Sequence, residues 1–294
     1  IHYLYYSLIL LCFLQSFEES FNTKIGECNL KIESSKNDLG LKKIIISNAE
    51  SLVRDFGPVN KNKFQVNIIN NKNSVKHFPN WASGIAFKNK VFILRDKLSN
   101  TVLSHEICHI YQNKIRNSKT FPSWFKEGMA MYFSKDFFDQ EVTTLSESVL
   151  LDYIIEIDKL GHISTLKGDK NIKVAYQESL YAYQKIINDY SDIVIKEIIH
   201  DMNNNVTTFE VAFQKVIGIP LSKFTSKADK EIKESAITSI FFNLPSILIF
   251  ISSIIITVIF IYIKVRNKKT IKRWEIEEQL ELLNEDNSNN IDNN

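Results

Sequence analysis

The sequence predicts an α+β domain followed by a single membrane-spanning helix. Two observations support this prediction. Extended patterns come first along the chain and helical patterns follow, an order typical of α+β domains. A long uncharged apolar stretch then lies close to the C-terminus. The chain has 294 residues, of which 44% are apolar, so it is long enough to bury a sizeable core.

The extended patterns lie in the first third of the chain, beside one helical pattern. Apolar residues at helical spacing predict a helix over residues 39–56, which Gly57 and Pro58 end. Residues 64–70, FQVNIIN, alternate as a strand does. Residues 84–87 and 90–95 flank Lys88 and Asn89, which predicts a hairpin.

Helical patterns dominate the rest of the chain up to residue 217. Pro122 suits the start of one of these helices, and Gly161 and Gly218 follow the ends of two others. The expected helices cover residues 101–115, 122–134, 145–159, 172–189, 191–203 and 206–217.

Two apolar segments bound the domain, which we expect to cover residues 18–234. Residues 1–17 have the length of the apolar core of a signal peptide, although no basic residue precedes them and no cleavage site is obvious, so an uncleaved N-terminal anchor is the alternative. The second segment carries no charge from Ser235 to Ile263, and we expect residues 240–263 to form a transmembrane helix.

Basic residues follow the second segment and predict its orientation. Because positive charge favours the cytoplasmic side, residues 264–294 are expected in the cytoplasm and the domain outside it. The end after Trp274 is expected to be a short disordered tail. The basic residues are Lys264, Arg266, Lys268, Lys269, Lys272 and Arg273.

Charge and cysteine content give no support to a nucleic-acid-binding or a disulfide-rich protein. A net charge of +2 gives no reason to expect a nucleic-acid partner. Cys12, Cys28 and Cys108 form no disulfide framework and no CxxC pair. Cys28 and Cys108 could pair outside the cell, but a buried, unpaired Cys108 is the favoured interpretation.

The chemistry is concentrated in the stretch VLSHEICHIYQNK, residues 102–114. His105 and His109 are four positions apart, so on a helix both imidazoles share a face and can bind one ion. Glu106 is rotated by about 100° and can address a water bound to that ion. Zinc suits such ligands, but a catalytic site needs a third protein ligand and an open position for water.

The candidate third ligand is Glu127 in FPSWFKEGMAMYF, residues 121–133. Apolar neighbours, among them Trp124 and Phe125, would bury that helix and leave the carboxylate in need of a partner. The alternative is an exposed glutamate at the solvent edge.

HEICH followed by WFKEGMA resembles the gluzincin zinc peptidases, in particular the peptidase MA-like families with HExxH and then WxxEGxA. The resemblance is specific over about residues 80–135. It implies a thermolysin-like zincin domain, with a small sheet above the active-site helix. It also implies one Zn²⁺ ion held by His105, His109 and Glu127, with Glu106 as general base.

Further expectations follow from the same resemblance. The strand that pairs with substrate would correspond to residues 81–87, where Gly84 permits close approach, and ordinary hairpin structure is compatible with that role. Asn113 could accept a hydrogen bond from an imidazole, whereas Met131 stands where thermolysin-like enzymes have an aspartate. Of Tyr176, Tyr181 and Tyr183, we favour Tyr176 as the catalytic donor to the oxyanion, the alternative being core packing.

These patterns lead to a membrane-anchored, outward-facing zinc metallopeptidase that takes a peptide or protein substrate. Residues 81–87 contain no acidic residue to bind a substrate amino terminus, as aminopeptidases of this superfamily do, which favours an endopeptidase. Two alternatives remain: a catalytically silent zinc-containing surface module, and a zinc hydrolase of a non-peptide envelope component.

Overall fold

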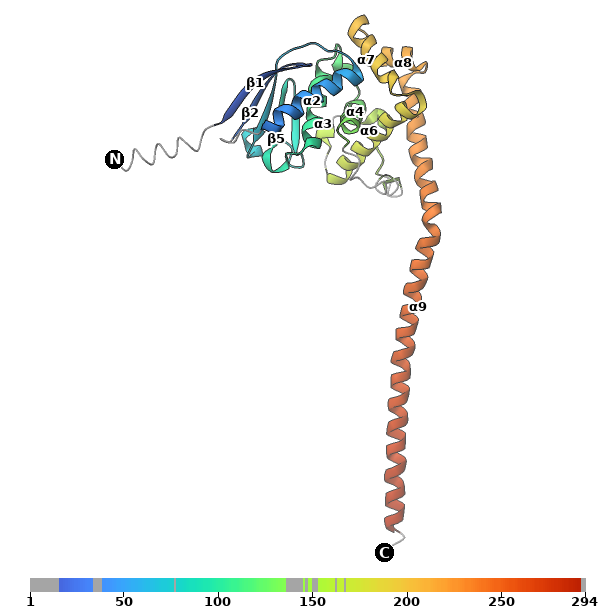
Figure 1. Ribbon diagram of the computed structural model, residues 1–294. Coiled ribbons are helices and arrows are strands. Elements are labelled where there is room, and N and C mark those ends of the chain that lie inside the picture. The colour runs from blue at the N-terminus through green and yellow to red at the C-terminus, as the bar shows by residue number, and fades with distance from the viewer. Residues whose placement is uncertain are drawn as a thin grey trace, which may run out of the picture. The chain divides into compact units, whose positions relative to one another are not determined.

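A computed structural model describes residues 16–33, 39–76, 78–135, 145, 148–149, 153–161, 163–166 and 168–291 (Figure 1). The chain divides into two compact units, Ile1–Ile237 and Thr238–Asn294. Within the described residues, the first unit has a small sheet followed mostly by helices. The predicted α+β class is therefore confirmed.

Five strands form one mixed sheet in the order β1-β2-β3-β5-β4. The strands β1 and β2 pair antiparallel, β2, β3 and β5 run parallel, and β4 closes the sheet antiparallel to β5. The edge strand β4 is thus paired on one side. The strands are β1 (Phe17–Thr23), β2 (Gly26–Ile32), β3 (Phe64–Ile69), β4 (Gly84–Phe87) and β5 (Lys90–Leu94).

The strand predicted over residues 64–70 is confirmed as β3, and the predicted hairpin is confirmed as β4 and β5. The strands β1 and β2 were not predicted. In β2 every second side chain is buried, from Gly26 to Ile32, and the intervening polar residues are half-buried. Phe17, assigned by the sequence to the N-terminal apolar segment, begins β1 instead. Residues 1–15 lie outside the described part of the chain, so the signal-peptide prediction stays untested.

Two helices pack on the sheet and on each other (Figure 1). The first, α2 (Leu39–Phe56), makes the crossover between β2 and β3, and the second, α3 (Asn100–Asn113), contacts both β4 and β5. The hydroxyl of Tyr111 on α3 donates to the carbonyl of Gly57 at 2.8 Å, beyond the end of α2. The helix that carries the HExxH motif is therefore held by the sheet edge on one side and by the end of α2 on another.

The remaining helices form a second layer around aromatic side chains. Trp124 and Phe125 of α4 contact Phe209 of α8 and Phe224 of α9, with ring centroids 4.5–6.5 Å apart. Burial of such rings stabilises the layer by several kcal/mol, at about 2 kcal/mol for each large side chain. The helices are α4 (Ser123–Ser134), α6 (Asp169–Tyr190), α7 (Ile193–Asn205), α8 (Phe209–Ile217) and α9 (Leu221–Ile291).

The helix predicted over 145–159 is wrong at its C-terminal end, and residues 145–152 lie mostly outside the described part. Residues 153–156 have no regular structure, and Ile157–Lys159 form a single 3₁₀ turn. The amide of Ile155 donates to the Glu178 carboxylate at 3.0 Å, and that of Ile157 donates to Asp229 at 3.1 Å. These two carboxylates from other helices replace the hydrogen bonds that a helix would have made.

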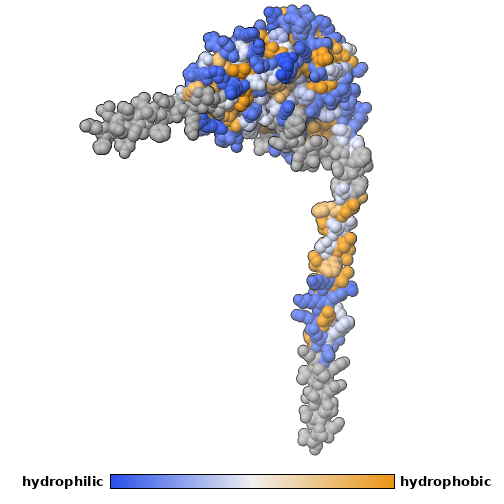
Figure 2. Space-filling view, in the orientation of Figure 1, coloured by the Kyte–Doolittle hydropathy of each residue, from blue (hydrophilic) through white to orange (hydrophobic). Residues whose placement is uncertain are grey.

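Within the described residues, α9 contains one candidate membrane span, Leu248–Glu278, by length and composition only. Its apolar part is followed by hydrophilic residues, visible as orange and then blue in Figure 2. This span overlaps the predicted residues 240–263, but helical structure continues to Ile291. The disordered tail predicted after Trp274 is therefore wrong up to that residue. Residues 275–283, rich in Glu and Leu, are good helix formers, whereas the Asn-rich residues 284–290 are not.

Val206, just after α7, holds a strained backbone conformation. Its φ is 56° and its ψ is 32°, the left-handed region that a β-branched side chain rarely adopts. The side-chain amide of Asn117 donates to the Val206 carbonyl at 2.7 Å and holds this turn in place. The strain therefore persists because another part of the chain fixes it.

We expect Val206→Asn to raise the free energy of unfolding by about 1 kcal/mol, because asparagine tolerates the left-handed region. Chemical denaturation of the full chain in detergent measures this change. Val211→Asn is the matched control, since Val211 is equally exposed but lies within helix α8. A control variant that gained as much stability as Val206→Asn would contradict the strain argument.

Candidate metal centre

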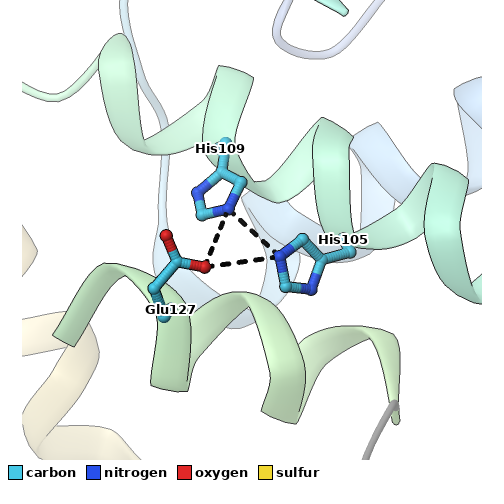
Figure 3. Close-up of side chains that lie close together, drawn as sticks. All are labelled: His105, His109 and Glu127. Carbon is cyan, nitrogen blue, oxygen red and sulfur yellow. Dashed lines mark hydrogen bonds and ion pairs between the residues drawn. The ribbon is translucent and has the colours of Figure 1, made fainter. Parts of the chain in front are cut away.

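Helix α3 places two imidazoles on one face, as the spacing predicts. The helix begins after Ser99, whose hydroxyl accepts from the Val102 amide at 3.1 Å and caps the first turn. One helical turn apart, His105 and His109 direct their Nε2 atoms toward each other at 3.2 Å (Figure 3). Two nitrogen lone pairs therefore converge on one small volume.

Helix α4 brings the Glu127 carboxylate to the same volume. Its Oε2 atom lies 3.5 Å from His105 Nε2 and 3.4 Å from His109 Nε2. The Glu127 side chain is only 20% exposed, so the alternative of a glutamate at the solvent edge is wrong. Helix α4 begins after Pro122 and packs against α3, so the two helices supply one cluster (Figure 3).

Gly128, next to Glu127, lets helix α6 approach α4 closely. A Cβ atom at this position would lie 2.3 Å from the Ser179 carbonyl oxygen and 2.7 Å from the Tyr183 Cβ. Both contacts are shorter than van der Waals distances, and one of them is with backbone. Glycine is therefore required here for the α4–α6 contact, which also positions Tyr176 on α6.

The three side chains fit a zinc ion by both chemistry and spacing. Imidazole nitrogen and carboxylate oxygen are zinc ligands at about 2.0–2.2 Å, which sets tetrahedral ligand atoms about 3.3–3.6 Å apart. The three distances in the cluster are 3.2, 3.4 and 3.5 Å. In addition, Glu127 Oε2 is buried and accepts no hydrogen bond from the described residues.

Electrostatics favour positive charge among these three groups. Burial alone would lower the pKa of His109, but the nearby Glu127 carboxylate outweighs it and raises that pKa to about 9. Burial would likewise raise the pKa of Glu127, yet the two imidazoles hold it well below its usual range. The cluster therefore stabilises a carboxylate that needs a cation beside it.

The partner of His109 is Gln112, a residue that the sequence analysis missed. Gln112 Oε1 lies 2.9 Å from His109 Nδ1. The predicted partner, Asn113, instead donates to the Lys88 carbonyl at 3.0 Å. That prediction was wrong because Asn113 lies on the side of α3 that faces the β4–β5 turn. The HExxH spacing alone carries no signal for Gln112.

Glu106 lies beside the cluster, under the edge strand. Its side chain is buried, with 6% of the residue exposed, and burial raises its pKa while His105 and His109 oppose that rise. A Cβ atom at Gly84 of β4 would lie 3.0 Å from Glu106 Cγ and 3.1 Å from Oε1. The absence of a side chain at position 84 therefore leaves room for the Glu106 carboxylate.

Of the three candidate tyrosines, Tyr176 lies nearest the cluster. Its ring centroid is 6.4 Å from that of His105 and 6.1 Å from that of Trp81. Tyr181 instead directs its hydroxyl toward Glu231 at 3.5 Å. Tyr183 is fully buried against Phe125, which matches core packing. Trp81 was not singled out in the sequence because a lone tryptophan carries no spacing signal.

A hollow of about 210 Å³ lies between residues 81–84, at the start of β4, and the helices α3 and α6. Glu106, His105 and Tyr176 line it together with the backbone around Gly84. A larger hollow of about 590 Å³ lies between α2, α4, α6 and α7, and its lining includes none of the three potential ligands. The smaller hollow is therefore the one that adjoins the candidate metal ligand His105 and Glu106.

No protein-family model matches the chain, and no curated protein matches it. Similar solved structures include an aminopeptidase N family protein from Idiomarina loihiensis, with a TM-score of 0.49, 14% identity and coverage of 73% of this chain and 46% of that one. An M1 zinc metallopeptidase from Deinococcus radiodurans has a TM-score of 0.47, 10% identity and coverage of 74% and 51%.

A variant of the Deinococcus radiodurans enzyme bound to a Tyr-Ser-Ala substrate has a TM-score of 0.45, 9% identity and coverage of 72% and 50%. This chain thus spans about half the length of these proteins. At such identities and TM-scores, neither their activity nor their substrates transfer to this chain. The function has to follow from the side chains of the site itself.

We expect the purified full chain to contain about one zinc ion and Glu127→Ala to lose it, because two histidines leave the ion short of a ligand. Elemental analysis after dialysis measures the zinc content. Glu106→Gln is the matched control: it alters a buried carboxylate outside the three-atom cluster and should keep its zinc. Full zinc content in Glu127→Ala would exclude Glu127 as a ligand.

Proposed function

We propose that this chain is a membrane-anchored zinc metallopeptidase of thermolysin-like, gluzincin type that cleaves peptide bonds within a chain. The observation that supports it most is the cluster of two imidazole nitrogens and one carboxylate oxygen within 3.5 Å of one another. A buried glutamate, a tyrosine and a sheet edge adjoin that cluster. Together these groups are the parts that hydrolysis of an extended substrate requires.

His105, His109 and Glu127 would hold the zinc ion, and His105 also lines the hollow. Bound there, zinc supplies a Lewis acid that polarises the substrate carbonyl and lowers the pKa of a bound water toward about 7. The protein residues then have three tasks: they move a proton, stabilise the developing oxyanion and align the substrate.

Glu106 is the proposed general base. It takes a proton from the attacking water and passes it to the leaving amine. Its burial beneath Gly84 keeps bulk water away, so the carboxylate is not fully solvated before it accepts the proton. The close approach of β4 also restricts the carboxylate to few positions, which favours a fixed distance to the reacting water.

Tyr176 is the proposed donor to the oxyanion. A phenol is neutral at physiological pH and can donate a hydrogen bond without adding charge. Edge-on contacts with His105 and Trp81 hold the Tyr176 ring in the lining of the hollow. A donor fixed in this way stabilises charge that develops on the carbonyl oxygen as the water attacks.

The edge strand β4 is the proposed site for the substrate backbone. Within the described sheet, one side of β4 pairs with β5 and the other carries no strand. An extended peptide can add to such an edge through main-chain hydrogen bonds. This feature favours a peptide over a non-peptide envelope component, because only a peptide offers the matching donors and acceptors along its backbone.

Endopeptidase activity is favoured by the charge of the hollow. Among the described residues that line it, Glu106 is the only acidic residue. Binding of a substrate amino terminus would need a second carboxylate there. A silent zinc-binding module is disfavoured, since a structural site needs ligands but no buried base beside them.

Helix α9 provides the proposed membrane anchor through the candidate span within Leu248–Glu278. Six basic residues between Lys264 and Arg273 favour a cytoplasmic C-terminus, as the sequence predicts. In the proposal, residues 18–234 form the catalytic domain outside the cytoplasm. Its substrates would then be peptides or proteins on that side of the membrane.

We expect Glu106→Gln to lower kcat for peptide cleavage by a factor of about 10²–10⁴, because the amide cannot accept the water proton. Cleavage of a broad peptide library by the full chain in detergent, with and without chelator, measures this. Zinc content serves as the control, since the variant should keep its metal. A zinc-loaded wild-type chain that cleaves no peptide would overturn the proposed activity.

Loss of the Tyr176 hydroxyl should lower kcat by about 10²-fold or more with little change in KM, since the donor acts on the transition state. Tyr176→Phe keeps the ring contacts with Trp81 and His105 and removes only the oxygen. Tyr181→Phe is the matched control on the same helix, because its hydroxyl faces Glu231. Equal rates for the Tyr176→Phe and Tyr181→Phe variants would exclude Tyr176 as the donor.

A further inference from the structure

Gln112 makes two well-formed hydrogen bonds beside the metal cluster. The residue is 1% exposed. Its Oε1 lies 2.9 Å from His109 Nδ1, and its Nε2 donates to the Lys126 carbonyl at 2.8 Å. Lys126 directly precedes Glu127, so one amide joins the helix of His109 to the helix of the third ligand.

The Lys126 carbonyl determines which way the Gln112 amide points. A backbone carbonyl oxygen can only accept a hydrogen bond, so the group facing it has to be the amide nitrogen. The amide oxygen must then face His109, and an oxygen acceptor requires a hydrogen on His109 Nδ1. When the His109 imidazole is neutral, its Nε2 atom therefore carries no hydrogen, and the Nε2 lone pair faces the cluster.

The second histidine of the cluster lacks a comparable constraint. His105 Nδ1 is buried and has no hydrogen-bond partner among the described residues. Within this part of the chain, Gln112 is the side chain that hydrogen-bonds an imidazole of the cluster on the face turned away from the other ligands. Orientation of the site should therefore depend strongly on this one amide.

We propose that Gln112 is a positioning residue: it fixes the tautomer and orientation of His109 and, through the Lys126 carbonyl, the distance between α3 and the Glu127 segment. The inference rests on the proposed metal site and adds what determines its affinity. Glutamine suits this position better than glutamate, because a carboxylate would accept from His109 but place an oxygen against the Lys126 carbonyl. Partners of this kind typically change metal affinity by about 10–100-fold.

The first test is zinc affinity, measured on the full chain in detergent by competition with a chromophoric chelator. Gln112→Met, of similar length and without hydrogen bonds, should weaken zinc binding by about 10-fold or more. Gln112→Glu restores the acceptor for His109 and should recover part of that loss. Asn113→Ala is the matched control, because the Asn113 side-chain amide donates to the Lys88 carbonyl and not to the cluster. This variant should bind zinc as tightly as the wild type does.

The second test reads the tautomer of His109 in the metal-free full chain by nitrogen NMR, with the signal assigned through His109→Gln. It is done at a pH well above the pKa of about 9 that the Glu127 carboxylate gives this imidazole, so that the ring is neutral. The wild type and Gln112→Glu should carry the hydrogen on Nδ1, whereas Gln112→Met should populate both tautomers. If Gln112→Met does not fold, the glutamate variant decides, and a hydrogen on Nε2 in that variant would overturn the proposal. Unchanged zinc affinity in a folded Gln112→Met chain would overturn it equally.

These measurements separate this inference from the proposed activity. Zinc affinity and the imidazole tautomer are read without any cleavage. A chain that binds zinc in a Gln112-dependent way but cleaves no peptide would support the positioning role and refute the peptidase. A chain that cleaves peptides, but whose zinc affinity does not depend on Gln112, would support the peptidase and refute the positioning role.

Discussion

The structure depends on bringing a carboxylate and two imidazoles together in a largely buried space. A buried carboxylate is costly unless a positive partner compensates it. Here Glu127 Oε2 lies 3.4–3.5 Å from two imidazole nitrogens and accepts no hydrogen bond from the described residues. A divalent cation would satisfy all three groups at once, which is why the packing of α3 on α4 and the chemistry of the site cannot be treated separately.

The rest of the first unit supports that contact from two sides. The sheet edge lies against Glu106 because Gly84 has no side chain to push it away. Helix α6 lies against α4 because Gly128 has none either, and α6 places Tyr176 in the lining of the hollow. Two glycines in unrelated elements thus set how closely the proposed base and the proposed donor approach the ligands.

The parts of the site that local spacing determines could be read from the sequence. His105 and His109 share a face because they are one helical turn apart, and any helix over these residues would bring them together. Glu127 followed from a resemblance and from its apolar neighbours. Gln112 could not be predicted, because its role depends on the Lys126 carbonyl of another helix, which no pattern within residues 102–114 reveals.

The same distinction holds for the fold. Strands β3, β4 and β5 are rich in apolar residues, whereas polar and charged residues make up about half of β1 and β2, and these two strands were missed. The segment at 153–159 has a helical pattern, yet Glu178 and Asp229 take its amide hydrogens. Tertiary contacts thus override local preference there.

The contact at Gly128 has a consequence for engineering and for natural variation. One added methyl group at Gly128 would force apart α4, which carries the candidate ligand Glu127, and α6, which carries the proposed donor Tyr176. Even alanine, the smallest substitution, should therefore disturb the site. The described residues that line the hollow, which include Trp81 and Val102, contain no comparable glycine contact between two helices. Under the proposed function, changes of substrate preference would be expected there.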